Sequence, residues 1–213
     1  MLGTRIILAD DHTLMLDALK HLLMPEFEVV GTFSDGRALV ESALRLKPDV
    51  IVLDIGMPIM NGLNAGQRLK RLRPAIKLIY LTMNHDPDIA AEAFRIGASG
   101  YLLKNSAASE LIHAIRKVVR GNSYVTPLIK EDVIGSPSHH FKNLKSTNYL
   151  TLRQKEVLQL LAEGRSMKEA AYILKVSPRT VAFHKYTMMD HLRIKTSAEL
   201  IQYAMTSHVL AAA

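Results

Sequence analysis

The sequence predicts a doubly wound α/β domain on a five-stranded parallel sheet, followed by a small all-α domain. Short apolar segments alternate with amphipathic helical segments as far as Val119. The last third of the chain shows helical periodicity only. Between these regions Gly, Ser, Pro and Asn are frequent, and apolar periodicity is weak. We therefore expect domains at residues 1–121 and 149–213, joined by a linker at residues 122–148.

Five short apolar segments are the expected strands of the sheet. Almost uninterrupted apolar runs are typical of strands that are buried on both faces of a parallel sheet. The expected strands are Arg5–Ala9, Phe27–Phe33, Val50–Leu53, Ile76–Leu81 and Tyr101–Leu103. A helical pattern follows each strand, and proline or glycine marks several of the helix ends. The expected helices are His12–Met24, Asp35–Leu46, Leu63–Leu72, Pro87–Ile96 and Ser106–Val119.

Four further helices are expected in the last third, each preceded by a capping sequence. In three of them a hydroxyl residue precedes Glu or Gln by three positions, which is the capping box. The other begins with Ser177-Pro178, a cap residue followed by proline at the first helical position. The expected helices are Leu152–Glu163, Met167–Leu174, Pro178–Leu192 and Ser197–Thr206. Only Lys175–Ser177 separates the second from the third, a spacing typical of a helix-turn-helix.

Composition narrows the class of protein. Residues 142–213 hold 11 basic and 5 acidic side chains, so this segment carries +6 of the net charge of +7. The excess favours a polyanionic partner, most often nucleic acid, although a solvated basic face explains the charge equally well. The chain has no cysteine, and it shows neither a signal peptide nor an apolar run of membrane-spanning length. We expect a cytoplasmic protein with no membrane partner.

Polar side chains follow four of the expected strands. Asp10 and Asp11 follow the first strand, Asp54 the third, Thr82 the fourth and Lys104 the fifth. Each residue alone has an ordinary explanation, such as a helix cap for Asp11 or a solvated strand end for Lys104. The carboxyl ends of strands in a doubly wound sheet meet at one crevice, however, so the series together indicates a site.

The residue types in this crevice suit phosphoryl chemistry. Carboxylates that converge repel one another, and hard oxygen ligands in a water-accessible crevice suit Mg²⁺. A carboxylate held on that metal can attack a phosphoryl group and form an acyl phosphate. The metal, the Lys104 ammonium and the Thr82 hydroxyl would then stabilise the transferring phosphoryl group.

Residues 4–120 resemble the receiver domains of two-component signalling, which have a flavodoxin-like fold. The matching segments are Ile7–His12, Val52–Gly62, Leu81–Thr82 and Gly100–Lys104. Many receivers have proline after the lysine, whereas this chain has Asn105. This difference leaves the geometry of the local peptide bond undetermined, but it does not change the charge chemistry expected of Lys104.

The receiver resemblance implies a role for each residue of the crevice. Asp54 would be the phosphoacceptor, and Thr82 and Lys104 would contact the phosphoryl group. Tyr101 would be the aromatic that changes rotamer when Thr82 moves, although ordinary packing at an edge strand also explains a tyrosine there. The implied Mg²⁺ ligands are Asp10, Asp11, Asp54 and the backbone carbonyl of Gly56.

Residues 149–206 resemble the helix-turn-helix domain of the NarL/FixJ, or LuxR, type. The matching residues are Leu150–Gly164, Lys168–Ala171, Val176–Val181, His184 and Leu192. The family often has proline where this chain has Leu152, which affects only the start of the helix. The resemblance also implies that the last helix forms a dimer interface on DNA.

The expected helix Pro178–Leu192 is the third in the last part of the chain. We expect it to enter the major groove of double-stranded DNA with its N-terminal part against the bases. The residues expected to reach phosphates are Ser177, Arg179, Thr180 and Lys185. The candidates for base contacts are Ala182, Phe183 and Tyr186, of which the two aromatics have core packing as the alternative. His184 is expected to have a structural role rather than to bind a metal.

The sequence thus favours a response regulator in which a partner histidine kinase phosphorylates Asp54, and a homodimer then forms on DNA. A second hypothesis keeps DNA binding but makes the receiver independent of phosphate, and the intact acid cluster argues against it. A third is a phosphohydrolase on the same fold. Such enzymes need a carboxylate two residues after the nucleophile, where this chain has Gly56, so we do not expect an enzyme.

Overall fold

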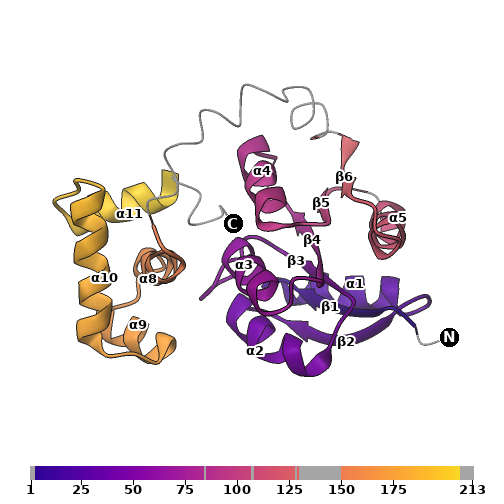
Figure 1. Ribbon diagram of the computed structural model, residues 1–213, viewed down its shortest axis with the longest axis horizontal. Helices are drawn as coiled ribbons and strands as arrows, with labels where there is room; N and C mark the ends of the chain where they lie inside the picture. The colour runs from indigo at the N-terminus through magenta and orange to yellow at the C-terminus, as the bar shows by residue number, and fades with distance from the viewer. Residues whose placement is uncertain (1–2, 84, 107, 128, 130–149, 207–213) are drawn as a thin grey trace. The chain divides into compact units, whose positions relative to one another are not determined.

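The computed structural model describes residues 3–83, 85–106, 108–127, 129 and 150–206 (Figure 1). The chain divides into two compact units, residues 1–137 and 138–212. Among the described residues, no helix has the length and apolar character needed to cross a membrane.

The first unit is a parallel sheet in the strand order β2-β1-β3-β4-β5-β6. This order makes the sheet doubly wound, as the sequence predicts. Its strands are β1 (Arg5–Ala9), β2 (Glu28–Phe33), β3 (Val50–Leu53), β4 (Lys77–Thr82), β5 (Gly100–Leu103) and β6 (Tyr124–Val125). The helices between them are α1 (Thr13–Leu23), α2 (Gly36–Leu46), α3 (Gly62–Leu72), α4 (Pro87–Ile96) and α5 (Ala108–Val119).

The helices cover both faces of the sheet. On one face, apolar side chains of α1 and α5 pack with alternate residues of four strands, including Ile6, Val52, Ile79 and Leu102. On the other face α2, α3 and α4 lie side by side (Figure 1). Burial on both faces explains why β1, β3, β4 and β5 are buried along almost their whole length rather than at every second residue, whereas the edge strand β2 is only half-buried.

The prediction of five strands was wrong by one strand. β6 pairs in parallel with β5, with Gly100 opposite Tyr124 and Tyr101 opposite Val125, inside the segment that the sequence assigns to the linker. A strand of two residues has no periodicity to detect, and β6 exists because the edge of β5 is there to pair with. After β6 the structure describes residues 126, 127 and 129 of the expected linker, and residues 128 and 130–148 lie outside the described residues.

The second unit contains the helices α8 (Leu152–Ala162), α9 (Met167–Leu174), α10 (Pro178–His191) and α11 (Ser197–Thr206). Capping boxes at Thr151 and Ser166 begin α8 and α9, and the Ser177 side chain accepts the Thr180 N–H at the start of α10. The helices bury a shared apolar core that includes Val157, Leu174, Val181, Met188 and Leu200. The turn between α9 and α10 gives the helix-turn-helix that the sequence predicts.

Candidate functional site

The carboxyl ends of the strands bring the predicted crevice residues together. The Asp54 N–H donates to the carbonyl of Ala9 at 2.8 Å, and the Lys104 N–H donates to the carbonyl of Thr82 at 2.8 Å. These backbone bonds continue the sheet ladder one residue beyond the strands. Asp10, Asp54 and Thr82 are therefore all buried at one edge of the sheet.

The ammonium of Lys104 lies between two buried carboxylates. Its Nζ is 2.7 Å from Asp10 Oδ2 and 2.9 Å from Asp54 Oδ2, and all three side chains are at most 7% exposed. The second oxygen of Asp54, Oδ1, accepts the N–H of Ile55 at 2.7 Å. Since charges leave water only when they are paired and hydrogen-bonded, this arrangement fixes the orientation of the Asp54 carboxylate.

Burial sets the protonation behaviour of this pair. It raises the pKa of the Asp54 carboxyl, an effect that the hydrogen bond and charge of Lys104 only partly offset. Burial also lowers the pKa of Lys104, but its hydrogen bonds to Asp10 and Asp54 outweigh this, so the pKa lies above its ordinary value. Lys104 thus stays charged at neutral pH beside a poorly hydrated carboxylate.

Three carboxylates and one imidazole meet at this edge. Ligand atoms of Asp10, Asp11, His12 and Asp54 all lie within 4.8 Å of one another. Oδ1 of Asp11 is shielded from solvent and accepts no hydrogen bond from the described part of the chain, although the His12 Nδ1 lies 2.9 Å away. A buried carboxylate oxygen without a donor is costly, and a hard cation would satisfy it. The donor set of this group therefore fits a divalent cation.

His12 is a member of this group that the sequence reasoning missed. Its backbone N–H and its ring Nδ1 lie 3.0 and 3.1 Å from Asp10 Oδ1. The signal was present, because His12 directly follows the two aspartates. It was overlooked because a residue at the start of a helix is ordinarily read as part of that helix.

Glycine allows the loop after Asp54, the phosphoacceptor candidate, to pass close to this residue. Gly62 donates its N–H to the carbonyl of Ile55 at 2.9 Å, and a Cβ at position 62 would lie 2.0 Å from the backbone oxygen of Asp54. A Cβ at Gly56 would instead meet Asp54 Oδ2 at 3.5 Å, an ordinary contact. Gly56 thus flanks the carboxylate, and Gly62 allows α3 to begin directly beneath it.

Tyr101 is fully buried in β5. Burial raises the pKa of its phenol well above the ordinary value, and the charges of Asp86 and Asp54 raise it further. Because β6 pairs with β5, the alternative of packing at an edge strand does not describe this tyrosine.

The α10 helix presents most of the expected DNA-contact residues on its outer side. Ser177, Arg179, Phe183 and Tyr186 are exposed, and Thr180 and Ala182 are half-buried. Phe183 is 65% exposed and Tyr186 is 59% exposed, so neither aromatic packs in the core of the unit.

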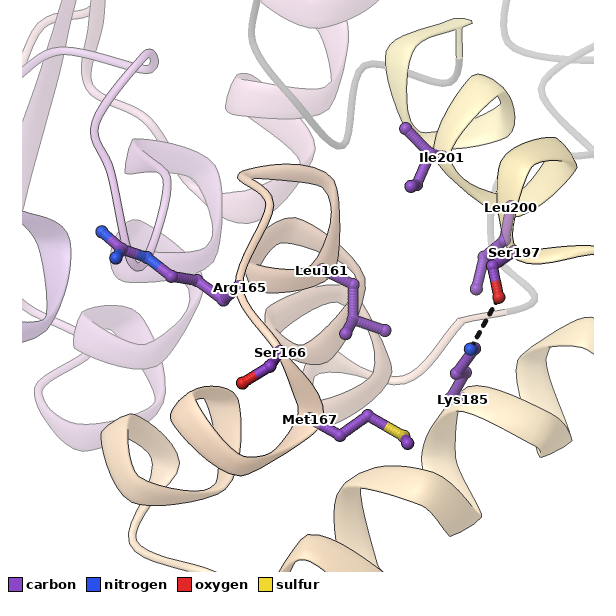
Figure 2. A pocket seen from close by; sticks show the side chains of 8 residues that line it. All are labelled: Leu161, Arg165, Ser166, Met167, Lys185, Ser197, Leu200 and Ile201. Carbon is purple, nitrogen blue, oxygen red and sulfur yellow. Dashed lines mark hydrogen bonds between the residues drawn. The ribbon is translucent and has the colours of Figure 1, made fainter.

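Lys185 is the expected phosphate contact that points elsewhere. Its Nζ donates to Ser197 Oγ of α11 at 2.7 Å (Figure 2). It lines a cavity of about 240 Å³ between α8, α9, α10 and α11, together with Leu161, Arg165, Ser166, Met167, Ser197, Leu200 and Ile201. The helix face therefore directs Phe183 and Tyr186 outward and Lys185 toward a neighbouring helix.

His184 lies on the inner side of α10. Its ring is half-buried, and burial together with the charge of Arg153 lowers its pKa. This placement agrees with the structural role expected for it, next to the ring of Phe183.

A doubly wound sheet with a buried Asp-Lys-Asp crevice, followed by a helix-turn-helix unit, defines the response regulators. Comparison with known families agrees: residues 6–116 match the response regulator receiver domain, and residues 148–204 match the luxR family of bacterial regulatory proteins. The chain belongs to the response regulators of the NarL/FixJ type, as the resemblance in its sequence implies.

Known relatives are similar along nearly the whole chain. The oxygen regulatory protein NreC of Staphylococcus carnosus is 34% identical, over 97% of this chain and 99% of its own. RcsB from Salmonella enterica serovar Typhimurium, bound to promoter DNA with a phosphomimetic, is 27% identical with a TM-score of 0.60, over 97% and 99% of the two chains. A structure of two RcsB dimers bound to two parallel DNAs is 27% identical with a TM-score of 0.59, over 96% and 98%.

Proposed function

We propose that a partner histidine kinase phosphorylates Asp54, and that the phosphorylated protein binds specific DNA sequences as a homodimer and regulates transcription. The observation that carries the proposal is the Lys104 ammonium, 2.7 and 2.9 Å from two buried carboxylates, in a chain that also has a helix-turn-helix. As a regulator of transcription from bacterial DNA, the protein acts in the cytoplasm.

The chemistry proposed for the crevice is attack by an Asp54 carboxylate oxygen on the phosphorus of a phosphohistidine. A phosphorus–oxygen bond forms and the phosphorus–nitrogen bond breaks, which leaves an acyl phosphate on Asp54 and returns the imidazole of the kinase. Poor hydration of the carboxylate favours attack. Lys104 already lies 2.9 Å from Asp54 Oδ2, so its charge is in place to stabilise the phosphoryl oxygens.

Mg²⁺ is the cation that we propose for the acidic group. Asp10, Asp11 and Asp54 would hold it, together with the backbone carbonyl of Gly56. When bound, Mg²⁺ would supply positive charge to the phosphoryl group. The unsatisfied Asp11 Oδ1 supports this assignment.

The proposed switch links Asp54 to β5. We expect the Thr82 hydroxyl to turn toward the phosphoryl group and the buried Tyr101 ring to move with it. Both residues are buried in neighbouring strands: Thr82 is the last residue of β4, and Tyr101 lies in β5 opposite Tyr80, two residues before Thr82 in the register of the two strands. A rearrangement that a local charge drives would shift the population toward the DNA-binding form.

DNA binding is proposed for α10, with Ser177, Arg179 and Thr180 at phosphates and the exposed aromatics at bases. RcsB is bound to DNA in the structures named above, two of its dimers in one of them, which supports a twofold arrangement of half-sites.

Intact-mass measurement after incubation with Mg²⁺ and a small phosphodonor tests the proposal. We expect one phosphoryl adduct on the native chain and none on Asp54→Ala. Asp49→Asn is the matched control, because Asp49 lies at the opposite end of β3, where its side chain accepts the Arg5 N–H; it should keep the adduct.

The second arm compares DNA affinity with and without the adduct. Tighter binding by the phosphorylated chain is expected. An adduct that leaves DNA affinity unchanged contradicts the switch, and no adduct on any variant favours a receiver that is independent of phosphate.

A further inference from the structure

The outer face of α10 has an unusual composition for a helix that reads DNA. Val181 and Met188 are buried in the core, and His184 and Lys185 are half-buried on either side of them. Helical spacing then puts Arg179, Ala182, Phe183 and Tyr186 on the opposite face, where the groove would be. Three of these four side chains are apolar or aromatic.

Groups that read base edges by hydrogen bonding are scarce on this face. Adenine is read by Asn or Gln and guanine by Arg or Lys, through paired hydrogen bonds. The α10 sequence, Pro178–His191, contains neither Asn nor Gln, and its one lysine, Lys185, donates to Ser197 on the other side. The polar groups on the outer side are Arg179 in the first turn, the hydroxyls of Thr180 and Thr187, the phenol of Tyr186 and the carboxylate of Asp190 near the end of the helix, and of these only Arg179 has paired donors.

The aromatic rings are exposed and yet held in place. Among the described residues, all the large aromatic side chains that are exposed lie in α9 and α10: Tyr172, Phe183 and Tyr186. The Phe183 ring meets the His184 ring edge to face at 5.6 Å between centroids. The Lys185 Nζ lies 5.7 Å from the centre of the Tyr186 ring. These contacts restrict both rings, so less entropy is lost when they bind a partner.

We propose that α10 recognises DNA mainly through the C5-methyl groups of thymine, with Phe183 and Tyr186 as the reading residues. The thymine methyl is the apolar group that the major groove offers, and it is the natural partner of a ring that cannot form paired hydrogen bonds. The basic side chains of the unit supply the sequence-independent attraction to phosphate, and the two rings supply the sequence preference. This inference rests on the proposed DNA binding and names the feature of DNA that is read.

The test uses the full chain, with and without the small phosphodonor, to select binding sites from random-sequence duplex DNA. Each thymine of the selected half-site is then replaced by uracil, which removes only the methyl group and keeps every hydrogen-bonding group. We expect at least one position per half-site at which uracil weakens binding by about fourfold, the effect of one buried methyl group.

Variants connect this sensitivity to the two rings. Each ring should be responsible for uracil sensitivity at the position that it contacts. At that position, the variant that lacks the ring, Phe183→Ala or Tyr186→Ala, should bind the thymine duplex and the uracil duplex with equal affinity. Both side chains are exposed, so the variants should fold, which thermal melting checks. Tyr172→Ala is the matched control: it removes an 88% exposed aromatic from α9 and should keep the discrimination.

The outcomes separate this inference from the function it rests on. Selection of no preferred sequence overturns sequence-specific DNA binding itself, and the inference with it. A selected site whose affinity is unchanged by uracil at every thymine overturns methyl recognition while leaving DNA binding intact. Uracil sensitivity that survives in both Phe183→Ala and Tyr186→Ala overturns the assignment of the two rings.

Discussion

The crevice of the receiver and the outer face of α10 differ in how far their side chains are buried. In the crevice, Asp10, Asp54 and Lys104 are almost fully buried and each is bonded to another. On α10, Phe183 and Tyr186 are more than half exposed. We therefore expect removal of a charged partner in the crevice to destabilise the receiver, and removal of an exposed aromatic from α10 to leave the stability of the helical unit unchanged. A group that performs chemistry must be oriented in advance, while a group that reads a partner must be left uncovered.

Removal of the crevice lysine should have the largest effect on stability and so test the first half of this contrast. Lys104→Met leaves two buried carboxylates without a cation, and we expect it to lower the free energy of unfolding by about 3 kcal/mol. Urea unfolding measures the loss, and added Mg²⁺ should recover part of it. The exposed Lys20→Met is the control and should change stability by less than about 0.5 kcal/mol. Equal stability of both variants would contradict the dependence of the receiver on its site.

Two substitutions on α10 separate stability from recognition in the other unit. Val181 is fully buried, so Val181→Ala should lower the stability of the helical unit by about 1–3 kcal/mol. Phe183→Ala should change stability by less than about 0.5 kcal/mol and yet weaken DNA binding. Thermal melting and DNA titration of both variants measure the difference. A Phe183→Ala variant that melts like Val181→Ala would place this ring in the core after all.

High pH should destabilise the receiver selectively. Burial raises the pKa of Tyr80 and Tyr101 well above the value near 10 of an unfolded chain. The unfolded state therefore loses protons first, and the receiver loses up to about 1.4 kcal/mol per pH unit above pH 10 for each tyrosine. Among the residues that the structure describes, the hydroxyl of Tyr80 also has no hydrogen-bond partner, so Tyr80→Phe should raise stability by about 1 kcal/mol at pH 7 and flatten the alkaline loss. Urea unfolding at pH 7 and 10.5 checks both, with Tyr172→Phe as the exposed control.

Low pH should loosen the helical unit, with the smallest effect of the four. Burial, and then the charge of Arg153, lowers the pKa of His184 below its unfolded value near 6.5. Its contribution is complete above that value and is lost as the pH falls through the folded pKa, because the unfolded chain takes up the proton first. The protection factors of α10 amides, which correct for the pH dependence of intrinsic hydrogen exchange, should be lower at pH 5.5 than at pH 7.5, and His184→Gln should reduce the difference. Equal protection factors at the two pH values would contradict this prediction.

The features that local sequence determines were predictable. β1, β3, α4, α9 and α11 match the expected ranges residue for residue. Apolar runs define the two strands, Pro87 and Gly97 mark the ends of α4, and the hydroxyl residues Ser166 and Thr196 precede α9 and α11. The convergence of Asp10, Asp54 and Lys104 follows from the topology of a doubly wound sheet, so the crevice was predictable once the strands were recognised.

The features that depend on tertiary neighbours were not predictable. The direction of Lys185 is decided by Ser197, twelve residues away on another helix. The exposure of Phe183 depends on what packs beside α10. The sequence of this helix is equally compatible with a Phe183 ring in the DNA groove and with one in the core of the unit. The contact of the His12 backbone with Asp10 is a local one, from an aspartate to the residue two positions on, whereas the direction of the His12 ring toward the acidic group depends on the fold.

The short strand β6 has a practical consequence for dissecting this protein. Thr126 donates its N–H to the Tyr101 carbonyl and its hydroxyl to Glu110 Oε1, which also accepts the hydroxyl of Tyr124. A receiver fragment that stops at Gly121 would lose these contacts and leave the apolar strand β5 as an open edge, ready to pair with another chain. A fragment that extends through Ile129 keeps that edge covered. Self-association of the shorter fragment would therefore be a product of where it was cut, and not a property of the switch.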